Sequence, residues 1–351
     1  MTATYKDLQR ETGLSLATIS KFYNGGAVRD ENARAIERAA AALGFRPNAF
    51  ARSLRSRRSG TIGVLLPALD NDFHLTVIAG VESALRPSGT SVIVSSSPDA
   101  EAGAVDLLRS RMVDGIIAVP SPHDVEALAR AAEQVPVVQI DWRADDLVVD
   151  GVFLDNHRAG ALAARHLLDH GHRRLGVVGG DPAVSTMRGR ADGFREVARQ
   201  AGADLAPDAV LAGPLTVANG QAAMQQLLVL PERPTAVFCA NHELTIGAVI
   251  AVNESGLTLG RDLSVLGFDG RELAQVTVPK LTVIEQPTHE IAVRAAERIA
   301  ERLDQRRTDP TAIASEPVDV LVVPRLVAGG SVARVGPPIT GPTEAWCCAT
   351  P

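Results

Sequence analysis

The sequence is poor in aromatic residues, in cysteine and in long apolar runs. Aromatic side chains make up 3% of its 351 residues, so any core must rest on Ala, Val, Leu and Ile. The three cysteines, Cys239, Cys347 and Cys348, are an odd number, and adjacent cysteines rarely bridge each other, which excludes a disulfide scaffold. The first 30 residues lack an apolar signal core, and no run of 18 apolar residues occurs. We therefore expect a soluble, cytoplasmic protein.

Sequence motifs of enzymes are also missing. The chain contains no GxGxxG, GxxxxGK(S/T), HExxH or GxSxG pattern, and its cysteines give no nucleophile signature. His166, His170 and His172 could suggest a metal site, but Gly171 ends the predicted helix before His172 and no further ligand pattern supports one. We therefore expect no enzyme, no metal and no cofactor, and surface or capping roles for these histidines.

What is present is an ordinary globular composition with an uneven charge. Hydrophobic residues make up 46% and charged residues 22%, and the length suffices for two or three domains. Residues 1–58 hold 11 basic and 5 acidic residues, a formal charge of +6, whereas the remainder has a formal charge of −12. A basic head on an acidic body predicts that the head binds a polyanion. On composition alone, a solvated helical surface explains this charge equally well.

The head, residues 1–46, is predicted to form three short helices. A capping box of Thr4 and Asp7 starts the first helix, and Gly13 stops it. Two helices joined by a tight turn that holds Gly13 are typical of a helix-turn-helix. The three helices are expected at about residues 4–11, 15–23 and 30–43.

Two segments of the chain do not read as globular domains. Residues 47–59 begin with a proline, can form one short helix and end in a basic run, which predicts a linker. Residues 332–351 are rich in Pro, Gly and Thr, which is typical of a flexible tail, and we assign them no function.

From Thr61 onward, short apolar strands alternate with helices. This pattern is typical of parallel sheets covered by helices on both faces, and the strands are too many for one compact sheet. The body is therefore predicted to have two α/β lobes. The expected strands are 61–66, 91–95, 115–119, 136–140, 152–154, 174–178, 235–239, 263–267 and 281–284. The expected helices are 74–86, 101–111, 123–133, 157–170, 188–201, 218–229, 242–255 and 287–306.

Polar and aromatic side chains follow many of the predicted strands. Ligands bind beyond the carboxyl ends of parallel strands, which in a two-lobed body means the cleft between the lobes. An arginine and carboxylates beside one or two aromatic faces suit a polyhydroxylated ring, although each residue taken singly also fits a local cap or turn. The candidates are Asp70, Asn71, Phe73, His74, Ser95, Asp141, Trp142, Arg143, Thr186, Arg190, Asn241, His242, Asp269 and Gln286.

A series of motifs runs through head and body. Those of the head and linker are Thr4–Leu8, Gly13–Lys21 with Asn24, Leu43–Ala49 and Ala51–Leu54. Those of the body are Thr61–Val64, Val113–Ile117, Asp155–Asn156, His166–Arg174, Gly193–Phe194, Ser264–Asp269 and Gln286–Pro287. In this order they resemble the lactose-repressor (LacI/GalR) family of bacterial transcription regulators, over roughly residues 3–331.

The resemblance implies an α/β protein with an N-terminal helix-turn-helix head and a two-lobed, periplasmic-binding-protein-like body with parallel sheets. It implies a homodimer that binds a near-palindromic DNA operator and responds to a small effector, in the first place a sugar or sugar derivative. The first lobe would comprise about residues 60–156 and 286–316, and the second about 157–285 and 317–331.

The resemblance also assigns DNA contacts. Leu16 and Ala17 would face base edges in the major groove, and Lys21 would reach guanine acceptors. The hinge residues would be Asn48, Ala51 and Leu54, of which Leu54 would wedge into the minor groove. The remaining DNA-binding positions, mostly phosphate contacts, would be Thr4, Tyr5, Ser15, Thr18, Ser20 and Asn24.

By the same resemblance, the strand-end candidates line an effector pocket together with Leu215. The chain departs from the family pattern at three positions. Arg29 stands where a small capping residue is usual, and His242 where an Asp commonly follows Asn241. Leu215 stands where many members have an aromatic floor, so stacking on that side is reduced.

Two alternatives stay open at this point. A transport-type sugar-binding protein would share the body, but it would need a signal peptide and would lack the basic head. A nucleobase or nucleoside effector would prefer aromatic stacking, which Leu215 makes less favourable without excluding it.

Overall fold

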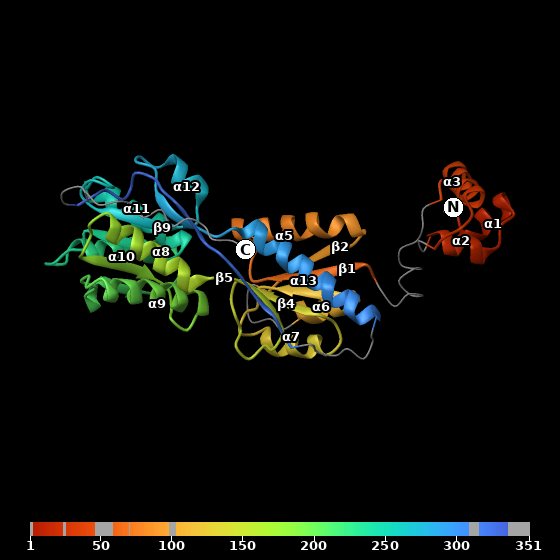
Figure 1. Ribbon diagram of the computed structural model, residues 1–351, viewed down its shortest axis with the longest axis horizontal. Helices are drawn as coiled ribbons and strands as arrows, with labels where there is room; N and C mark the ends of the chain where they lie inside the picture. Colours follow the sequence, from red (N-terminus) through yellow and green to blue (C-terminus); the bar gives the residue numbers. More distant parts are fainter. Residues whose placement is uncertain are drawn as a thin grey trace. The chain divides into compact units, whose positions relative to one another are not determined.

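The computed structural model describes residues 3–23, 26–45, 59–69, 71–97, 103–308 and 316–335. The chain divides into two units: residues 1–61 with 112–114, and the rest of the chain (Figure 1). Several predictions fall outside the described residues, namely those for Asn24, Asp70, the hinge residues Asn48, Ala51 and Leu54, and the tail beyond residue 335.

The first unit begins with the three predicted helices. They are α1 (Tyr5–Thr12), α2 (Leu16–Tyr23) and α3 (Asp30–Leu43). Gly13 ends α1 with a φ of 66°, which glycine adopts at little cost. Buried apolar residues from the three helices, Leu8, Ile19, Ile36 and Ala39, form the core together with Phe45. Arg29 precedes α3 and makes no side-chain cap, so this helix starts with its acidic first turn alone.

The first lobe of the body is built on a six-stranded sheet. Its strands are β1 (Thr61–Leu66), β2 (Ser91–Ser96), β3 (Gly115–Ala118), β4 (Val137–Ile140), β5 (Asp150–Leu154) and β11 (Asp319–Val322), in the order β11-β5-β4-β3-β1-β2. Helices α5 (Asp72–Leu85) and α13 (Thr288–Thr308) pack together on one face, and α6 (Ala104–Ser110) and α7 (Val125–Ala132) cover the other (Figure 1). A short 3-10 helix, Arg86–Ser88, follows α5.

The second lobe repeats this plan. Its strands are β6 (Leu175–Gly179), β7 (Val210–Ala212), β8 (Ala236–Cys239), β9 (Ser264–Phe268), β10 (Thr282–Glu285) and β12 (Arg325–Val327), in the order β12-β10-β9-β8-β6-β7. Only the pairing of β12 with β10 is antiparallel among the described pairs of this sheet. The helices are α8 (Asn156–Asp169), α9 (Ser185–Gln200), α10 (Val217–Leu228), α11 (His242–Glu254), α12 (Arg271–Val276) and the 3-10 helix Pro207–Ala209.

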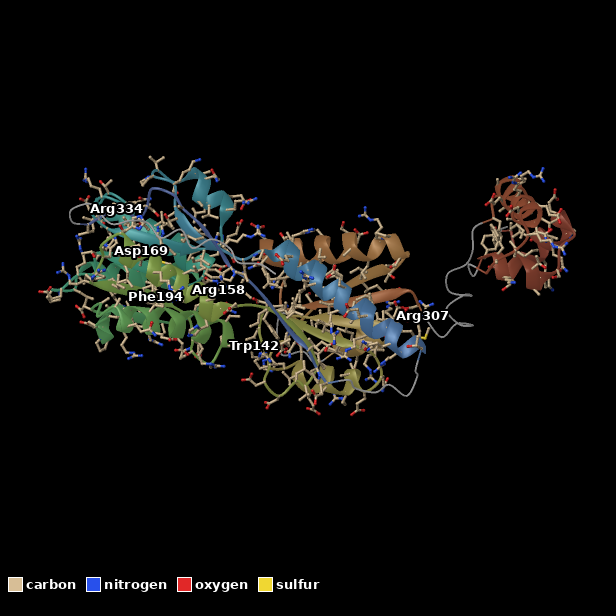
Figure 2. The ribbon with its side chains drawn as sticks, in the orientation of Figure 1. Trp142, Arg158, Asp169, Phe194, Arg307 and Arg334 are labelled. Carbon is tan, nitrogen blue, oxygen red and sulfur yellow. The ribbon has the colours of Figure 1, made fainter. Side chains whose placement is uncertain are left out.

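Helices α8 and α9 approach each other closely enough to require glycine. A Cβ added at Gly160 of α8 would lie 1.9 Å from the carbonyl oxygen of Arg190 on α9. A Cβ at Gly193 of α9 would lie 1.9 Å from the carbonyl oxygen of His157. Next to Gly193, the buried ring of Phe194 stacks on Phe238 at 5.3 Å, within the lobe as Figure 2 shows. This packing fixes the position of α9 against the sheet.

The chain crosses between the lobes three times: from β5 to α8, from β10 to α13 and from β11 to β12. The two lobes confirm the predicted architecture, but one predicted boundary is wrong. Residues 317–331 do not all belong to the second lobe, because β11 pairs in parallel with β5 of the first lobe, with Val320 opposite Val152. The short elements β7, β11, β12 and α12 were not predicted, because three to six residues give little periodicity.

The start of the predicted tail is also wrong. Val332 is buried in the core of the second lobe, and the Ser331 hydroxyl donates to the carbonyl oxygen of Val265 at 2.6 Å. The backbone N–H of Val335 donates to the carbonyl oxygen of His170 at 2.7 Å. Residues 332–335 therefore belong to the second lobe.

Candidate functional site

Helix α2 presents the predicted base-reading side chains on one exposed face. Leu16, Ala17 and Lys21 are exposed, whereas Ile19 is fully buried in the head core. Helical spacing therefore separates an exposed face from a packing face.

Two predicted DNA-binding residues, Thr4 and Ser15, cap helix starts, and a third, Thr18, bonds to Ser15. The Ser15 hydroxyl oxygen accepts from the backbone N–H of Thr18 at 3.1 Å, and the two hydroxyls share a hydrogen bond of 2.9 Å. The Asp7 carboxylate accepts from the backbone N–H and the hydroxyl of Thr4 at 2.9 and 2.7 Å. These bonds hold the first turns of α1 and α2 in place, and Ser20, the next candidate along α2, is half-buried.

Tyr5 belongs to an aromatic cluster that closes the head. Its ring meets those of Tyr23 and Phe45 edge to face, at centroid distances of 5.8 and 5.3 Å. Such edge-to-face pairs stabilise beyond the area that they bury. The cluster ties Phe45, at the end of the described head, to α1 and α2.

Lys21 is positioned by a glycine that sequence reasoning missed. The backbone N–H of Gly26 donates to the carbonyl oxygen of Lys21 at 2.8 Å. A Cβ added at Gly26 would lie 2.6 Å from Cγ of Lys21, so the lysine stem lies directly over this glycine. Gly26 lies beyond the end of the predicted second helix, and nothing in the sequence pattern points to its contact with Lys21.

In the body, Arg190 of α9 is buried at the carboxyl ends of the second-lobe strands. Its Nε donates to Oδ1 of Asn156 at 2.8 Å, and its Nη1 donates to the carbonyl oxygen of Ala240 at 2.7 Å. The guanidinium carbon lies 3.5 Å from the centroid of the Phe268 ring. Burial lowers the pKa of Arg190 to about 10, against the opposing influence of Asp269 and Asp141, so the group stays charged at neutral pH.

Asp269 and Gln286 lie together, as predicted for two strand-end residues. The Asp269 carboxylate accepts from the backbone N–H of Gln286 at 2.9 Å and from its Nε2 at 2.5 Å. Burial raises the pKa of Asp269 to about 6, although both bonds from Gln286 and the charge of Arg190 act in the opposite direction. The buried site therefore disfavours the negative charge of this carboxylate.

Asp141 brings the first lobe to this site. It follows β4, and burial raises its pKa, whereas the charges of Arg190 and His74 lower it. Asp141 and Asp269 both have positive φ angles, 61° and 54°, which non-glycine residues rarely adopt outside functional or tightly held positions. His74 and Asp141 from the first lobe and Arg190 and Asp269 from the second thus form one electrostatic cluster, called the lobe-spanning cluster below.

The loop after β4 also touches α9 of the second lobe. The backbone N–H of Arg143 donates to the Ser185 hydroxyl at 3.1 Å, next to the buried Thr186. Trp142 lies in the same loop, at the end of the first lobe that meets the second (Figure 2). The Arg143 side chain itself pairs with Asp319 at 2.5 Å, so it serves the first lobe.

For the remaining candidates the structure shows local contacts. Asn71 and Asn241 cap α5 and α11, because their side-chain oxygens accept from the N–H groups of Phe73 at 2.8 Å and Leu244 at 3.2 Å. The Phe73 ring meets His74 edge to face at 5.7 Å, and Ser95 is buried within β2 rather than after it. Leu215 is 38% exposed and packs over Gly180.

Two residues of the site, Asn156 and Phe268, were not singled out as effector residues. Asn156 and Phe268 hold the Arg190 guanidinium, and their only sequence signal is their place in motifs of the resemblance. Among the described residues, His242 Nδ1 and Gln286 Oε1 are buried without a hydrogen-bond partner. Such atoms are rare in native structures unless a ligand or water serves them. Both flank the Asp269–Gly270 turn, because the His242 ring lies against Gly270.

The three histidines at the end of α8 have structural contacts. The rings of His166 and His170 contact each other at a tilt of 42°, with centroids 4.3 Å apart, and His172 bonds to Thr235 and to the carbonyl oxygen of Ala333 at 2.9 and 3.0 Å. Within the described ranges, no group of three or more His, Cys, Asp or Glu residues is placed to hold a metal ion. In the same ranges, no helix is long and apolar enough to cross a membrane.

Comparison with known proteins decides the family. Residues 59–321 match the family described as periplasmic binding proteins and sugar binding domain of LacI family. The chain belongs to the LacI family. It is therefore a transcription regulator and not an enzyme.

Curated relatives of this LacI-family chain extend over both head and body. The ribose operon repressor of Haemophilus influenzae is 32% identical over 323 residues, which cover 91% of this chain and 97% of the relative. The HTH-type transcriptional repressor PurR of Yersinia enterocolitica is 32% identical over 339 residues, covering 93% and 98%.

Solved structures agree with this assignment. The Lac repressor dimer bound to operator and the anti-inducer ONPF matches with a TM-score of 0.81 at 25% identity, over 95% of this chain and all of that one. A putative ribose operon repressor from Burkholderia thailandensis matches with a TM-score of 0.68 at 28% identity, over 77% of this chain and 99% of that one.

Proposed function

We propose that this LacI-family regulator is a repressor that binds a near-palindromic operator as a homodimer. A small polyhydroxylated effector, bound at the lobe-spanning cluster, sets its affinity for that operator. The observation that carries this proposal is the cluster itself, in which Asp141 of one lobe and Asp269 of the other both act on the buried Arg190. A site that draws on both lobes can link ligand binding to their relative arrangement.

The chemistry of the cluster suits neighbouring hydroxyl groups. A guanidinium has five N–H donors, and bonds from Nε and Nη1 of Arg190 to the protein use two of them. The carboxylates of Asp141 and Asp269 are acceptors. A sugar hydroxyl both donates and accepts, so adjacent hydroxyls can bridge the arginine and a carboxylate. His242 Nδ1 and Gln286 Oε1 offer further polar atoms that lack a partner.

The same site favours a sugar over a nucleobase. A base stacks on an open aromatic face, and in the second lobe Arg190 covers Phe268, which is 1% exposed, while Leu215 offers no ring. Relatives of equal identity are named as a ribose operon repressor and as PurR, so names alone do not separate the two classes. We propose a pentose or related sugar, with a purine as the second candidate.

The proposed mechanism is a shift between two arrangements of the lobes. The three crossings between the lobes are short, and rotation of a few backbone bonds there moves one sheet against the other. A ligand shifts this equilibrium only if it binds one arrangement better than the other. Contacts with both Asp141 and Asp269 supply such a difference, because opening the lobes separates the two residues.

On the DNA side, we propose that α2 of each head enters a major groove. Leu16, Ala17 and Lys21 face the bases there. The capped first turns of α1 and α2, together with Tyr5, Ser20 and Asn24, contact phosphates. Asn48, Ala51 and Leu54 form the hinge, with Leu54 as a minor-groove wedge. Because the regulator must share a compartment with the chromosome, we propose that it acts in the cytoplasm.

The test is calorimetry with a panel of pentoses, hexoses and purine bases, followed by gel shifts on a duplex selected by the protein from a randomised pool. Arg190→Ala should abolish binding of the panel member that the parent binds, while duplex binding without it persists. Arg195→Ala, on the exposed side of the same helix, is the matched control. Equal panel affinity for the parent and Arg190→Ala would show that Arg190 has a purely structural role.

A further inference from the structure

The Asp114 carboxylate holds the chain at the point where the linker ends. Asp114 lies just before β3, in the motif Val113–Ile117, to which the proposed function gives no role. Its Oδ1 accepts from the backbone N–H of Ser59 at 2.9 Å and from the Ser59 hydroxyl at 3.3 Å. Its Oδ2 accepts from the backbone N–H of Gly60 at 2.8 Å. Charge-assisted bonds of this kind are stronger than neutral ones.

These bonds extend the pairing of β1 and β3 beyond the sheet. Ile62 lies opposite Gly115 in the parallel pair, and the backbone N–H of Asp114 donates to the carbonyl oxygen of Thr61 at 2.8 Å. The side chain of Asp114 then continues the contact to Gly60 and Ser59. Gly60 has a φ of +66°, so the chain turns sharply there and both N–H groups point to one carboxylate.

The consequence is that the chain becomes fixed to the sheet at Ser59, two residues before β1 begins. Any movement of the β1–β3 edge therefore carries Ser59 with it. The predicted hinge, residues 47–59, ends at this same residue. Without the carboxylate, residues 59 and 60 would act as a flexible joint and absorb the movement.

We propose that Asp114 is a positioning residue that transmits the movement of the first lobe to the hinge. The proposal rests on the proposed function, because it presumes that the hinge contacts DNA. Asp114 is partly exposed, and a Cβ at Gly60 would meet no atom within 4 Å, so neither residue fills a core. Both can be replaced without creating a cavity, which separates this role from a contribution to folding.

The experiment measures hydrogen exchange and DNA binding on the full chain. In Asp114→Ala, the amides of residues 59–61 should exchange at least tenfold faster than in the parent. Affinity for the duplex selected by the parent should fall about tenfold, or 1.4 kcal/mol, because residues 59 and 60 must then be ordered on binding. The calorimetric affinity for the panel sugar or purine that the parent binds should stay unchanged. The change in duplex affinity that this compound causes should be smaller than in the parent.

Gly60→Ala provides a second route to the same result, because a side chain strains the positive φ and breaks the turn. The double variant should be no worse than either single variant. Gly89→Ala is the matched control, since Gly89 has a φ of +73° with no atom within 4 Å of an added Cβ, in the turn before β2.

Two outcomes overturn the proposal. One is unchanged exchange and unchanged duplex affinity in both Asp114→Ala and Gly60→Ala. The other is a Gly89→Ala variant that loses duplex affinity equally. If the parent selects no duplex, the proposed function is wrong, and so is the proposal that Asp114 transmits movement to the hinge. The exchange rates of residues 59–61 still show, independently, whether Asp114 holds Ser59 and Gly60.

Discussion

Single residues in the lobe-spanning cluster are held at a cost to stability. Burial raises the pKa of Asp269 to about 6 even though Gln286 donates two hydrogen bonds to it. The left-handed backbone of the same residue adds strain. Residues kept in such positions at strand ends are typical of binding sites, where a ligand relieves part of the cost.

Asp269→Asn should change how stability depends on pH. An unfolded Asp has a pKa of about 3.9, so between about pH 4 and 6 the folded parent binds more protons, and its stability falls as pH rises by about 2–3 kcal/mol at most. The variant should lose this slope and be more stable than the parent at pH 7. A rotated Gln286 amide can accept from the new amide through Oε1, which has no partner in the parent.

Thermal unfolding of both proteins from pH 4 to 7 checks this expectation. Asp192→Asn, a change on the exposed surface of α9, serves as control and should keep the slope of the parent. Parallel curves for the parent and Asp269→Asn would contradict a raised pKa at this carboxyl.

Lys21 and Gly26 should act as one unit in reading DNA. Lys21→Ala should cost about 1–3 kcal/mol in binding to the selected duplex if the lysine reads a base. Gly26→Ala should weaken binding in the parent, because the new methyl group displaces the lysine stem. In a Lys21→Ala background, Gly26→Ala should have no further effect. Fluorescence anisotropy on the four proteins measures the coupling, and additive losses would show that Gly26 acts independently of Lys21.

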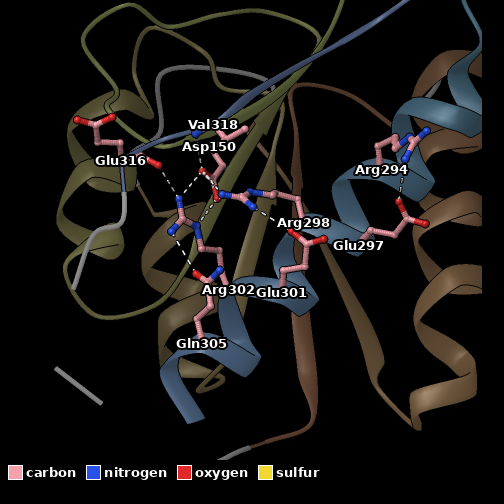
Figure 3. A network of polar contacts seen from close by, with 9 residues as sticks. All are labelled: Asp150, Arg294, Glu297, Arg298, Glu301, Arg302, Gln305, Glu316 and Val318. Atoms are coloured by element: carbon pink, nitrogen blue, oxygen red, sulfur yellow. Dashed lines mark hydrogen bonds and ion pairs between the residues drawn. The ribbon is translucent and has the colours of Figure 1, made fainter. Parts of the chain in front are cut away.

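At the scale of elements, a buried ionic network ties α13 to the first-lobe sheet (Figure 3). The Asp150 carboxylate, at the start of β5, accepts from Nε of Arg298 at 2.9 Å and from Nε of Arg302 at 2.6 Å. It also accepts from the backbone N–H of Val318 at 2.8 Å. Arg302 in turn donates to the carbonyl oxygen of Glu316 at 3.1 Å. The network therefore joins a strand, a helix and the segment that leads into β11.

Asp150→Ala should destabilise the protein by about 3–5 kcal/mol, because two arginines would lose the buried partner that they share. Burial alone would raise the pKa of Asp150, but the hydrogen bonds from Arg302 and Arg298 outweigh it and the pKa is lowered. This contribution is therefore complete above the unfolded pKa of about 3.9 and is lost as pH falls through the lower folded value. Urea unfolding at pH 7 and at acid pH, with the exposed Asp106→Ala as control, measures both effects.

The elements were predictable to different degrees, for physical reasons. Long helices such as α3, and buried strands such as β9, carry a clear period and were predicted to within one or two residues. β11 was missed because its apolar run, residues 320–323, is only four residues long, too short to distinguish a strand from a loop by periodicity. At the site, Arg190 and Asp269 were predictable because they follow strands. The residues that accept hydrogen bonds from Arg190 were not predictable. Asn156 comes from a distant stretch of chain and Ala240 accepts through its backbone carbonyl, which no local pattern reveals.

At the scale of the whole molecule, the part proposed to bind DNA is basic and the part proposed to bind the effector is acidic. The basic residues of the head and linker give residues 1–58 a formal charge of +6, while the body carries −12. A negative body repels DNA and so confines attraction to the head and linker. The proposed effector contacts, in contrast, depend on Arg190, which is 3% exposed and therefore little screened by salt. Salt should thus act very differently on the two binding events.

Duplex binding should weaken steeply with salt, whereas effector binding should not. If each head of a dimer neutralises about three phosphates, log K falls with a slope of about −5 against log salt, or about a thousandfold between 50 and 200 mM. A chain shortened to begin at residue 59 should keep full affinity for the panel sugar or purine and lose the selected duplex. Anisotropy and calorimetry across the salt series measure both. Duplex binding by the shortened chain, or a flat salt response of the full chain, would place the DNA contacts in the acidic body and overturn this division.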